Sequence, residues 1–251
     1  MKQLITVLGF LVVFYSQAQY SANDTALSIP MFYASYSFQV PQGDLADRFG
    51  VNSTIGGGFQ WKAPSNWIFG AEFNFIFGSE VKNTDSLMAN IKTESGHIIN
   101  MSGNFAAMSL YERGYNIAFK FGKIIPVLSP NPNSGLLLMG GVGYLQHKIR
   151  IEVENNSAPQ IDGDYKKGYD HLSGGLSTSQ FIGYSYLGDN RLLNFYGGVE
   201  FVQGWTKPRR DVNFDTMLPD EKKNRFDAFI GIKVAWVIPI FERKPEKFYY
   251  N

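Results

Sequence analysis

The chain has 251 residues, no cysteine, and 23 basic against 22 acidic residues, which give a formal net charge of +1. This balance argues against a nucleic-acid-binding protein, because such domains are usually distinctly basic. The absence of cysteine excludes disulfides, thiolate metal sites and a cysteine nucleophile. Aromatic residues make up 16% of the chain and charged residues only 18%, with 26 glycines. This mixture favours strands with one lipid-facing side over a soluble enzyme.

The first 18 residues have the pattern of a secretory signal peptide. Lys2 supplies the positive start, Leu4–Tyr15 is an apolar run, and Ser16-Gln17-Ala18 offers small residues where a signal peptidase reads. We predict cleavage after Ala18. The alternative is an N-terminal membrane anchor, but the run is shorter than the ~20 residues that a spanning helix needs. Beyond it, no apolar stretch has that length, so the remainder is either secreted and soluble or a closed barrel.

Eight segments of the remaining chain alternate apolar with small or polar residues, and a period of two indicates strands. In the third segment, for example, Phe69, Phe73 and Phe75 alternate with Glu72 and Asn74. The eight predicted strands cover residues 32–40, 51–62, 67–77, 115–121, 135–153, 173–187, 193–205 and 226–238.

The predicted connections alternate between short and long. The short ones are 63–66, 129–134 and 188–190, and the long polar ones are roughly 41–50, 79–110, 154–172 and 206–224. Short periplasmic turns opposite long extracellular loops are typical of bacterial membrane barrels. We therefore predict an all-β fold, an eight-stranded antiparallel up-and-down transmembrane β-barrel. It would comprise residues 19–241 after a cleaved signal peptide (1–18), with both termini and the tail (242–251) in the periplasm. The alternative is a soluble sandwich with an aromatic core.

Aromatic residues gather beside the short connections. They are predicted to form a girdle at the periplasmic membrane interface. The members are Trp61, Trp67, Tyr186, Phe195, Trp236 and Phe241.

The signal peptide, the alternating repeats and the alternating loop lengths resemble the small eight-stranded barrels of the outer-membrane protein A and X type, over about residues 25–241. The resemblance is architectural and implies a location in the bacterial outer membrane. That group includes structural proteins, adhesins, accessory subunits and a few lipid-modifying enzymes, so it implies no single activity. One departure is the C-terminus, since many such barrels end on a strand-terminal aromatic, whereas here Phe241 is followed by residues 242–251.

Four charged residues fall on inward-facing positions of the predicted strands, namely Glu72, Lys120, Glu200 and Lys233. An eight-stranded barrel has room inside for side chains but not for an open channel. Because an unpaired buried charge is costly, we expect the two acids and two bases to form a network of ion pairs in the lumen. A proton path or gated pore is the functional alternative.

The three histidines are candidates for catalytic or metal-binding residues. His97 falls in a long loop and His147 on an outward position of its strand, neither with a metal partner nearby in sequence, so no metal or cofactor is expected. His171 and Ser173 form a His-x-Ser at the rim, which is similar to the arrangement in lipid A 3-O-deacylases. That resemblance would make His171 the base and Ser173 the nucleophile. Only Asp170 is close enough in sequence to orient the histidine.

Basic residues lie near the predicted extracellular ends of two strands. Lys148 and Arg150 belong to the fifth strand, and Lys207, Arg209 and Arg210 follow the seventh. Such cations can bind the phosphates of lipopolysaccharide. Basic side chains that are simply solvated where a loop begins are an equally good explanation.

The sequence thus predicts a non-enzymatic outer-membrane barrel that serves as a structural protein or as an accessory subunit of an envelope complex. Its expected partners are membrane lipid, lipopolysaccharide and another outer-membrane or periplasmic protein, and no nucleic acid. Glycines on lipid-facing positions would leave flat patches for a second barrel to pack against; these are Gly57, Gly141, Gly143 and Gly197. The alternatives are a lipid A-modifying hydrolase acting through His171 and Ser173, and a surface adhesin or ligand binder using the 79–110 loop.

Overall fold

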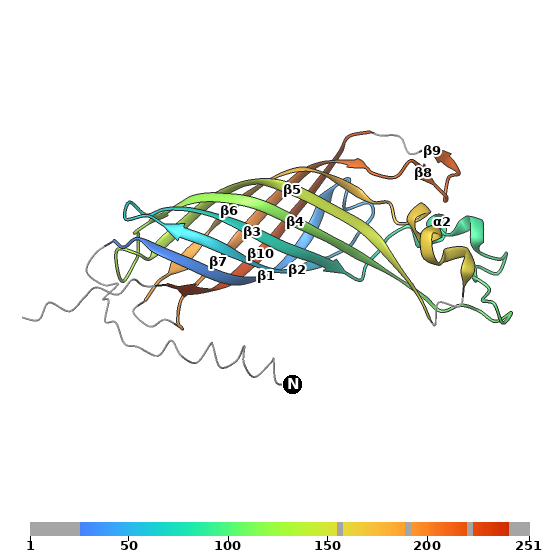
Figure 1. Cartoon of the computed structure of the whole chain (residues 1–251), viewed down its shortest axis with the longest axis horizontal. Helices are drawn as coiled ribbons and strands as arrows, with labels where there is room; N and C mark the ends of the chain where they lie inside the picture. The colour runs from blue at the N-terminus through green and yellow to red at the C-terminus, as the bar shows by residue number, and fades with distance from the viewer. Residues whose placement is uncertain (1–25, 155–157, 189–191, 220–222, 241–251) are drawn as a thin grey trace, which may run out of the picture.

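The computed structural model describes residues 26–154, 158–188, 192–219 and 223–240. Among them, eight antiparallel strands form a closed barrel in which each strand pairs with its neighbours along the chain and the last closes onto the first (Figure 1). The strands are β1 (Ile29–Gly43), β2 (Asn52–Lys62), β3 (Trp67–Gly78), β4 (Met108–Ile125), β5 (Gly135–Val153), β6 (Ser173–Tyr186), β7 (Phe195–Pro208) and β10 (Arg225–Pro239). The predicted fold is confirmed.

The long connections gather at one end of the barrel, here called the long-loop end, and the short connections at the other, the short-turn end (Figure 1). The smaller elements all lie at the long-loop end: α2 (Thr84–Leu87), η1 (Ala89–Ile91), η3 (Pro159–Ile161), η4 (Gly163–Gly168), β8 (Val212–Asn213) and β9 (Leu218–Pro219). None of the helices in the described ranges is both long and apolar enough to cross a membrane. The predicted signal peptide and the tail 242–251 lie outside the described residues.

Strand β4 is longer than the predicted 115–121, since it runs from Met108 to Ile125 and pairs with β5 along its whole length. At the long-loop end its outward residues include Ser109 and Arg113, which are polar. An alternation of apolar and polar residues therefore disappears there, although the strand continues.

Side chains alternate between the barrel interior and the outer wall along each strand. On β3, Phe69, Phe73 and Phe75 are exposed on the outer wall while Glu72 and Asn74 are buried inside, as predicted. On β5 the even-numbered residues face outward, so the prediction that Gly141 and Gly143 face lipid was wrong. The long apolar start of β5 carries no alternation that could have fixed its facing.

The interior is filled by side chains in two apolar clusters. One cluster lies toward the short-turn end and includes Ile29, Ile68 and Leu137. The other reaches from the barrel into the long loops and includes Leu45 and Phe49 of the connection between β1 and β2. Because Leu45 and Phe49 are 0% and 1% exposed, the first loop closes the mouth of the barrel instead of standing in solvent.

Candidate functional site

Four charged side chains from four strands meet inside the barrel, between the two apolar clusters. Nζ of Lys120 lies 3.3 Å from Oε1 of Glu72 and 2.8 Å from Oε1 of Glu200. Nζ of Lys233 lies 2.6 Å from Oε2 of Glu72 and 3.2 Å from Oε1 of Glu200. Each lysine therefore contacts both glutamates, and the result is a closed, neutral ring of two acids and two bases.

The ring is fully removed from solvent, since none of its members is more than 4% exposed. Two hydroxyl groups and one amide complete its hydrogen bonding: Tyr33 donates to Oε2 of Glu72 at 2.8 Å, Nδ2 of Asn74 donates to Oε1 of Glu72 at 2.6 Å, and Lys120 donates to Oγ of Ser179 at 2.8 Å. Burying four charges is tolerable here because each has an opposite charge and additional hydrogen bonds. The ring blocks the lumen and leaves no charged group of the four unpaired.

Glycines make room for the ring in the narrow interior. Each charged residue lies directly across from a glycine of a neighbouring strand. A long side chain is therefore always paired with a residue that has no side chain. The pairs are Glu72 with Gly58, Lys120 with Gly70, Glu200 with Gly231, and Lys233 with Gly198. The inward glycines are thus the sequence feature that accompanies a filled, charged lumen.

The short-turn end of the lumen is closed by Lys62, which is 0% exposed. Its ammonium donates to the backbone oxygen of Leu27 at 3.1 Å and to Oδ1 of Asn133 at 2.8 Å. The connection between β4 and β5, which contains Asn133, therefore folds over this end of the barrel.

A second polar cluster lies under the first loop, at the mouth of the barrel. Oδ1 of Asp227 on β10 lies 2.6 Å from Nη2 of Arg48, and its Oδ2 lies 2.8 Å from Nε2 of His147 on β5. The ring of Phe49 packs edge-on against the imidazole, with 5.8 Å between centroids. The prediction that His147 faces outward was wrong: it is fully buried, because odd-numbered residues of β5 face inward. Arg48 and Asp227 carry no motif in the sequence that predicts this contact, because they come from opposite ends of the chain.

His171 and Ser173 do not form the pair of base and nucleophile that their spacing predicted. Oγ of Ser173 is buried and donates to the backbone oxygen of His171 at 3.2 Å, and it accepts from Nη1 of Arg225 at 3.3 Å. Nε2 of His171 instead lies 3.2 Å from Oδ2 of Asp215 in the last long loop. His171 has a φ of 45°, and this left-handed backbone turns the chain between the two residues.

The basic residues near the long-loop end have different surroundings. Lys148 and Arg150 are exposed on the outer wall of β5, directly across from Arg113 and Tyr111 of β4. Nη2 of Arg150 lies 2.7 Å from Oε1 of Glu152. Arg113 also belongs to this cluster; it is half-buried, and its guanidinium lies 4.8 Å from the centroid of the Tyr111 ring. The sequence did not predict this position because the expected strand was too short.

Lys207 and Arg209 are exposed, whereas Arg210 is held within the long loops. Its Nε and Nη2 donate to the two carboxylate oxygens of Asp170 at 2.8 and 2.5 Å. The hydrogen bonds and charge of Asp170 raise the pKa of the Arg210 guanidinium above its ordinary value. Arg210 therefore fastens the last long loop to the residues before β6.

The predicted aromatic girdle lies at the short-turn end of the outer wall. Trp61, Trp67, Phe195 and Trp236 are exposed there, and Tyr186 is half-buried and stacks on Phe195 at 5.5 Å between ring centroids. Phe241 lies outside the described residues. The described members belong to β2, β3, β6, β7 and β10, and they lie where a membrane interface is expected.

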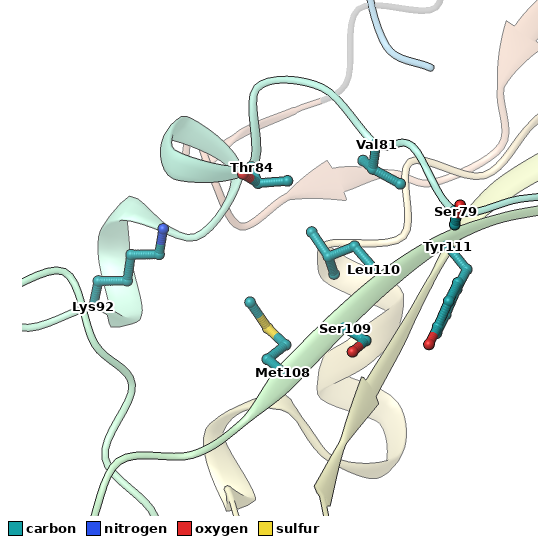
Figure 2. Close-up of a pocket in the computed structure, with 8 residues that line it drawn as sticks. All are labelled: Ser79, Val81, Thr84, Lys92, Met108, Ser109, Leu110 and Tyr111. Carbon is teal, nitrogen blue, oxygen red and sulfur yellow. The ribbon is translucent and has the colours of Figure 1, made fainter. Parts of the chain in front are cut away.

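A hollow of about 370 Å³ lies at the long-loop end between the 79–92 segment and β4 (Figure 2). Val81, Met108 and Leu110 give it an apolar floor. Lys92 lies at its edge, but Nζ of Lys92 is 2.6 Å from Oδ1 of Asp85 and so is already paired within the loop. Among the described residues, no group of histidine and acidic side chains could hold a metal ion.

No family model matches the chain, and no curated protein matches it. Solved structures do resemble it. Ail, the attachment invasion locus protein of Yersinia pestis, is 9% identical with a TM-score of 0.42, covering 84% of this chain and 99% of that one. Neisserial surface protein A is 9% identical with a TM-score of 0.37, covering 82% and 96%. The N-terminal β-barrel domain of Pseudomonas aeruginosa OprF is 8% identical with a TM-score of 0.34, covering 84% and 100%.

At sequence identities of 8 and 9%, these structures do not indicate the function of this chain, which must be inferred from its own residues. Its fold and interior define a closed β-barrel whose lumen is filled by side chains and whose outer wall is apolar.

Proposed function

We propose that the protein is a non-enzymatic integral barrel of the bacterial outer membrane that serves as an accessory or structural subunit in the cell envelope. The observation that carries this proposal is the apolar outer wall around a sealed interior. Phe32, Phe73, Phe119 and Val142, on four different strands, are 52%, 49%, 76% and 55% exposed. A soluble protein rarely exposes an apolar band that surrounds it, whereas a membrane barrel requires one.

The orientation follows the lengths of the connections. Short turns would lie in the periplasm together with both termini, and the long loops outside the cell. The aromatic girdle would then mark the periplasmic interface. The outward cations Arg113, Lys148 and Arg150 would lie at the opposite interface, at the level of the lipopolysaccharide phosphates, which guanidinium and ammonium groups bind well.

Buried side chains fill the described interior of the barrel, so the contacts of the protein are expected to lie on its outer surface. One candidate contact is a hollow of about 720 Å³ on the outer wall over β1, β2, β6, β7 and β10, near the short-turn end. Gly197 of β7 lines it, and an added Cβ at Gly197 would meet no atom closer than 3.6 Å. The barrel itself does not require glycine there, and the missing side chain leaves room for a neighbouring membrane protein.

The test is purification from native outer membranes in mild detergent, followed by measurement of the particle mass and of the co-purifying chains. We expect the unaltered protein to elute with a different chain at defined stoichiometry. Gly197→Trp should lose that chain while remaining inserted, and Phe119→Trp, on β4 at the opposite side of the barrel, should keep it. Co-purification of the same chain with Gly197→Trp would reject the hollow as the contact. An unaltered protein free of other chains would reject the accessory role and leave the structural one.

A second candidate function is surface binding through the connection between β3 and β4. Its outer part exposes Met101 and Phe105, at 73% and 63%, and the Phe105 ring stacks on His97 at 4.2 Å between centroids. Exposed apolar side chains on a polar loop are candidate contact points. Cells whose protein lacks residues 98–106 should then lose adhesion that the intact protein confers; unchanged adhesion would reject this role.

A further inference from the structure

A polar patch interrupts the apolar outer wall where β6 and β7 pair. Thr178 and Gln180 of β6 and Gln203 of β7 all face outward. The Thr178 hydroxyl donates to Oε1 of Gln203 at 3.0 Å, and Nε2 of Gln180 donates to the same oxygen at 3.1 Å. Three polar side chains are thus joined on the surface that would otherwise meet only lipid.

The residues around this patch are apolar. Ile182 and Leu176 flank it along β6 and are 50% and 69% exposed, and Phe201, 39% exposed, lies directly across from Gln180. Gln180 is six residues from Tyr186 of the aromatic girdle, or about 20 Å along the strand at roughly 3.3 Å per residue. With the usual barrel tilt this corresponds to about 15 Å of height above the girdle, within an apolar band that is typically about 25 Å tall. The patch therefore lies at the depth of the lipid tails.

The patch keeps hydrogen-bonding capacity that lipid tails cannot satisfy. Within the described part of the chain, Oε1 of Gln180 and Nε2 of Gln203 form no hydrogen bond. One is an acceptor and the other a donor, and polar groups left unpaired in hydrocarbon are costly. An outward amide pair in this position is expected where another protein, and not lipid, covers the wall.

We propose that a second copy of this chain packs against this wall and forms a two-fold symmetric dimer through the amides of Gln180 and Gln203. The patch is self-complementary, because the free acceptor on one copy matches the free donor on the other, as an isologous contact requires. Gly140 of β5 lies directly across from Gln180 and adds no side chain beside the patch. This inference rests on the proposed outer-membrane location. It adds a specific partner, a second copy of the chain, which the location alone does not imply.

The chain contains no cysteine, so a single introduced cysteine gives an unambiguous cross-link. Gln180→Cys would be expressed in the full-length protein and oxidised in isolated outer membranes. The matched control is Phe73→Cys, which faces outward on β3, away from the β6–β7 wall. We expect a disulfide-linked dimer of the chain for Gln180→Cys, at a yield many times that of Phe73→Cys.

A second measurement removes the patch without adding a thiol. Replacing Gln180 and Gln203 together by leucine makes the wall uniformly apolar, so the barrel should still insert while the detergent-purified particle falls from two copies to one. The proposal fails if Gln180→Cys cross-links no more than Phe73→Cys, if it links only to a different protein, or if the double leucine variant stays dimeric. A protein absent from the membrane fraction would instead overturn the proposed location.

Discussion

Replacing Glu200 by glutamine removes one of the two negative charges in the buried ring. Lys120 and Lys233, which lie 2.8 and 3.2 Å from Oε1 of Glu200, would then share Glu72 alone. One buried positive charge is left uncompensated, and breaking a buried ion pair in this way typically costs about 3–5 kcal/mol. With a urea dependence of about 2 kcal/mol per molar, the unfolding midpoint should fall by roughly 2 M.

The assay is urea unfolding of the barrel in detergent micelles or lipid bilayers. The matched control is Glu152→Gln, which breaks the exposed pair with Arg150 and should cost about 0–1 kcal/mol. Adding Lys233→Met to Glu200→Gln restores a neutral interior with one acid and one base, so part of the lost stability should return. A stabilising role of the buried ring is refuted if Glu200→Gln shifts the midpoint no more than Glu152→Gln, or if the double variant is less stable than the single one.

Three further predictions concern the long-loop end. Gly168→Leu should loosen the loops, because even a Cβ at this position would lie 2.2 Å from the Phe214 ring. Proteolytic cleavage between β7 and β10 should become faster while the barrel stays intact, and an unchanged cleavage rate would contradict the prediction. Asp227→Asn should weaken the closure of the mouth by the first loop, since Arg48 and His147 lose their shared carboxylate; faster hydrogen exchange at residues 44–50 is expected, and unaltered protection would argue against it. Joint replacement of Lys148 and Arg150 by glutamine should lower the amount of lipopolysaccharide that co-purifies with the protein, and an equal amount would reject those two residues as contacts.

The strands were predictable where one face is apolar and the other polar, as on β3, whose Phe69, Phe73 and Phe75 alternate with Glu72 and Asn74. The same reasoning failed on β5, because both faces of its first half are apolar or glycine. The wrong facing of Gly141, Gly143 and His147 follows from that one ambiguity. The facing of the four charged residues was predicted, and the structure brings all four into contact.

Contacts between distant segments could not be predicted from spacing. Arg48 and Asp227 are 179 positions apart, and they meet only because the first loop folds back into the mouth that β10 lines. The contact of His171 with Asp215 likewise depends on how the last long loop folds over the rim. The pairing of Thr178 with Gln203 depends on the register between β6 and β7, which the alternation within each strand does not specify.

We propose that the barrel spans the bacterial outer membrane with its long loops outside. The most direct measurement is to label single-cysteine variants on intact cells with a membrane-impermeant thiol reagent, comparing Met101→Cys at the long-loop end with Leu128→Cys at the short-turn end. Both positions are highly exposed, at 73% and 94%, and the chain has no other cysteine. Met101→Cys should be labelled on intact cells, and Leu128→Cys only after the outer membrane is opened. Equal labelling of both on intact cells, the reverse pattern, or recovery of the protein in the soluble fraction would contradict it.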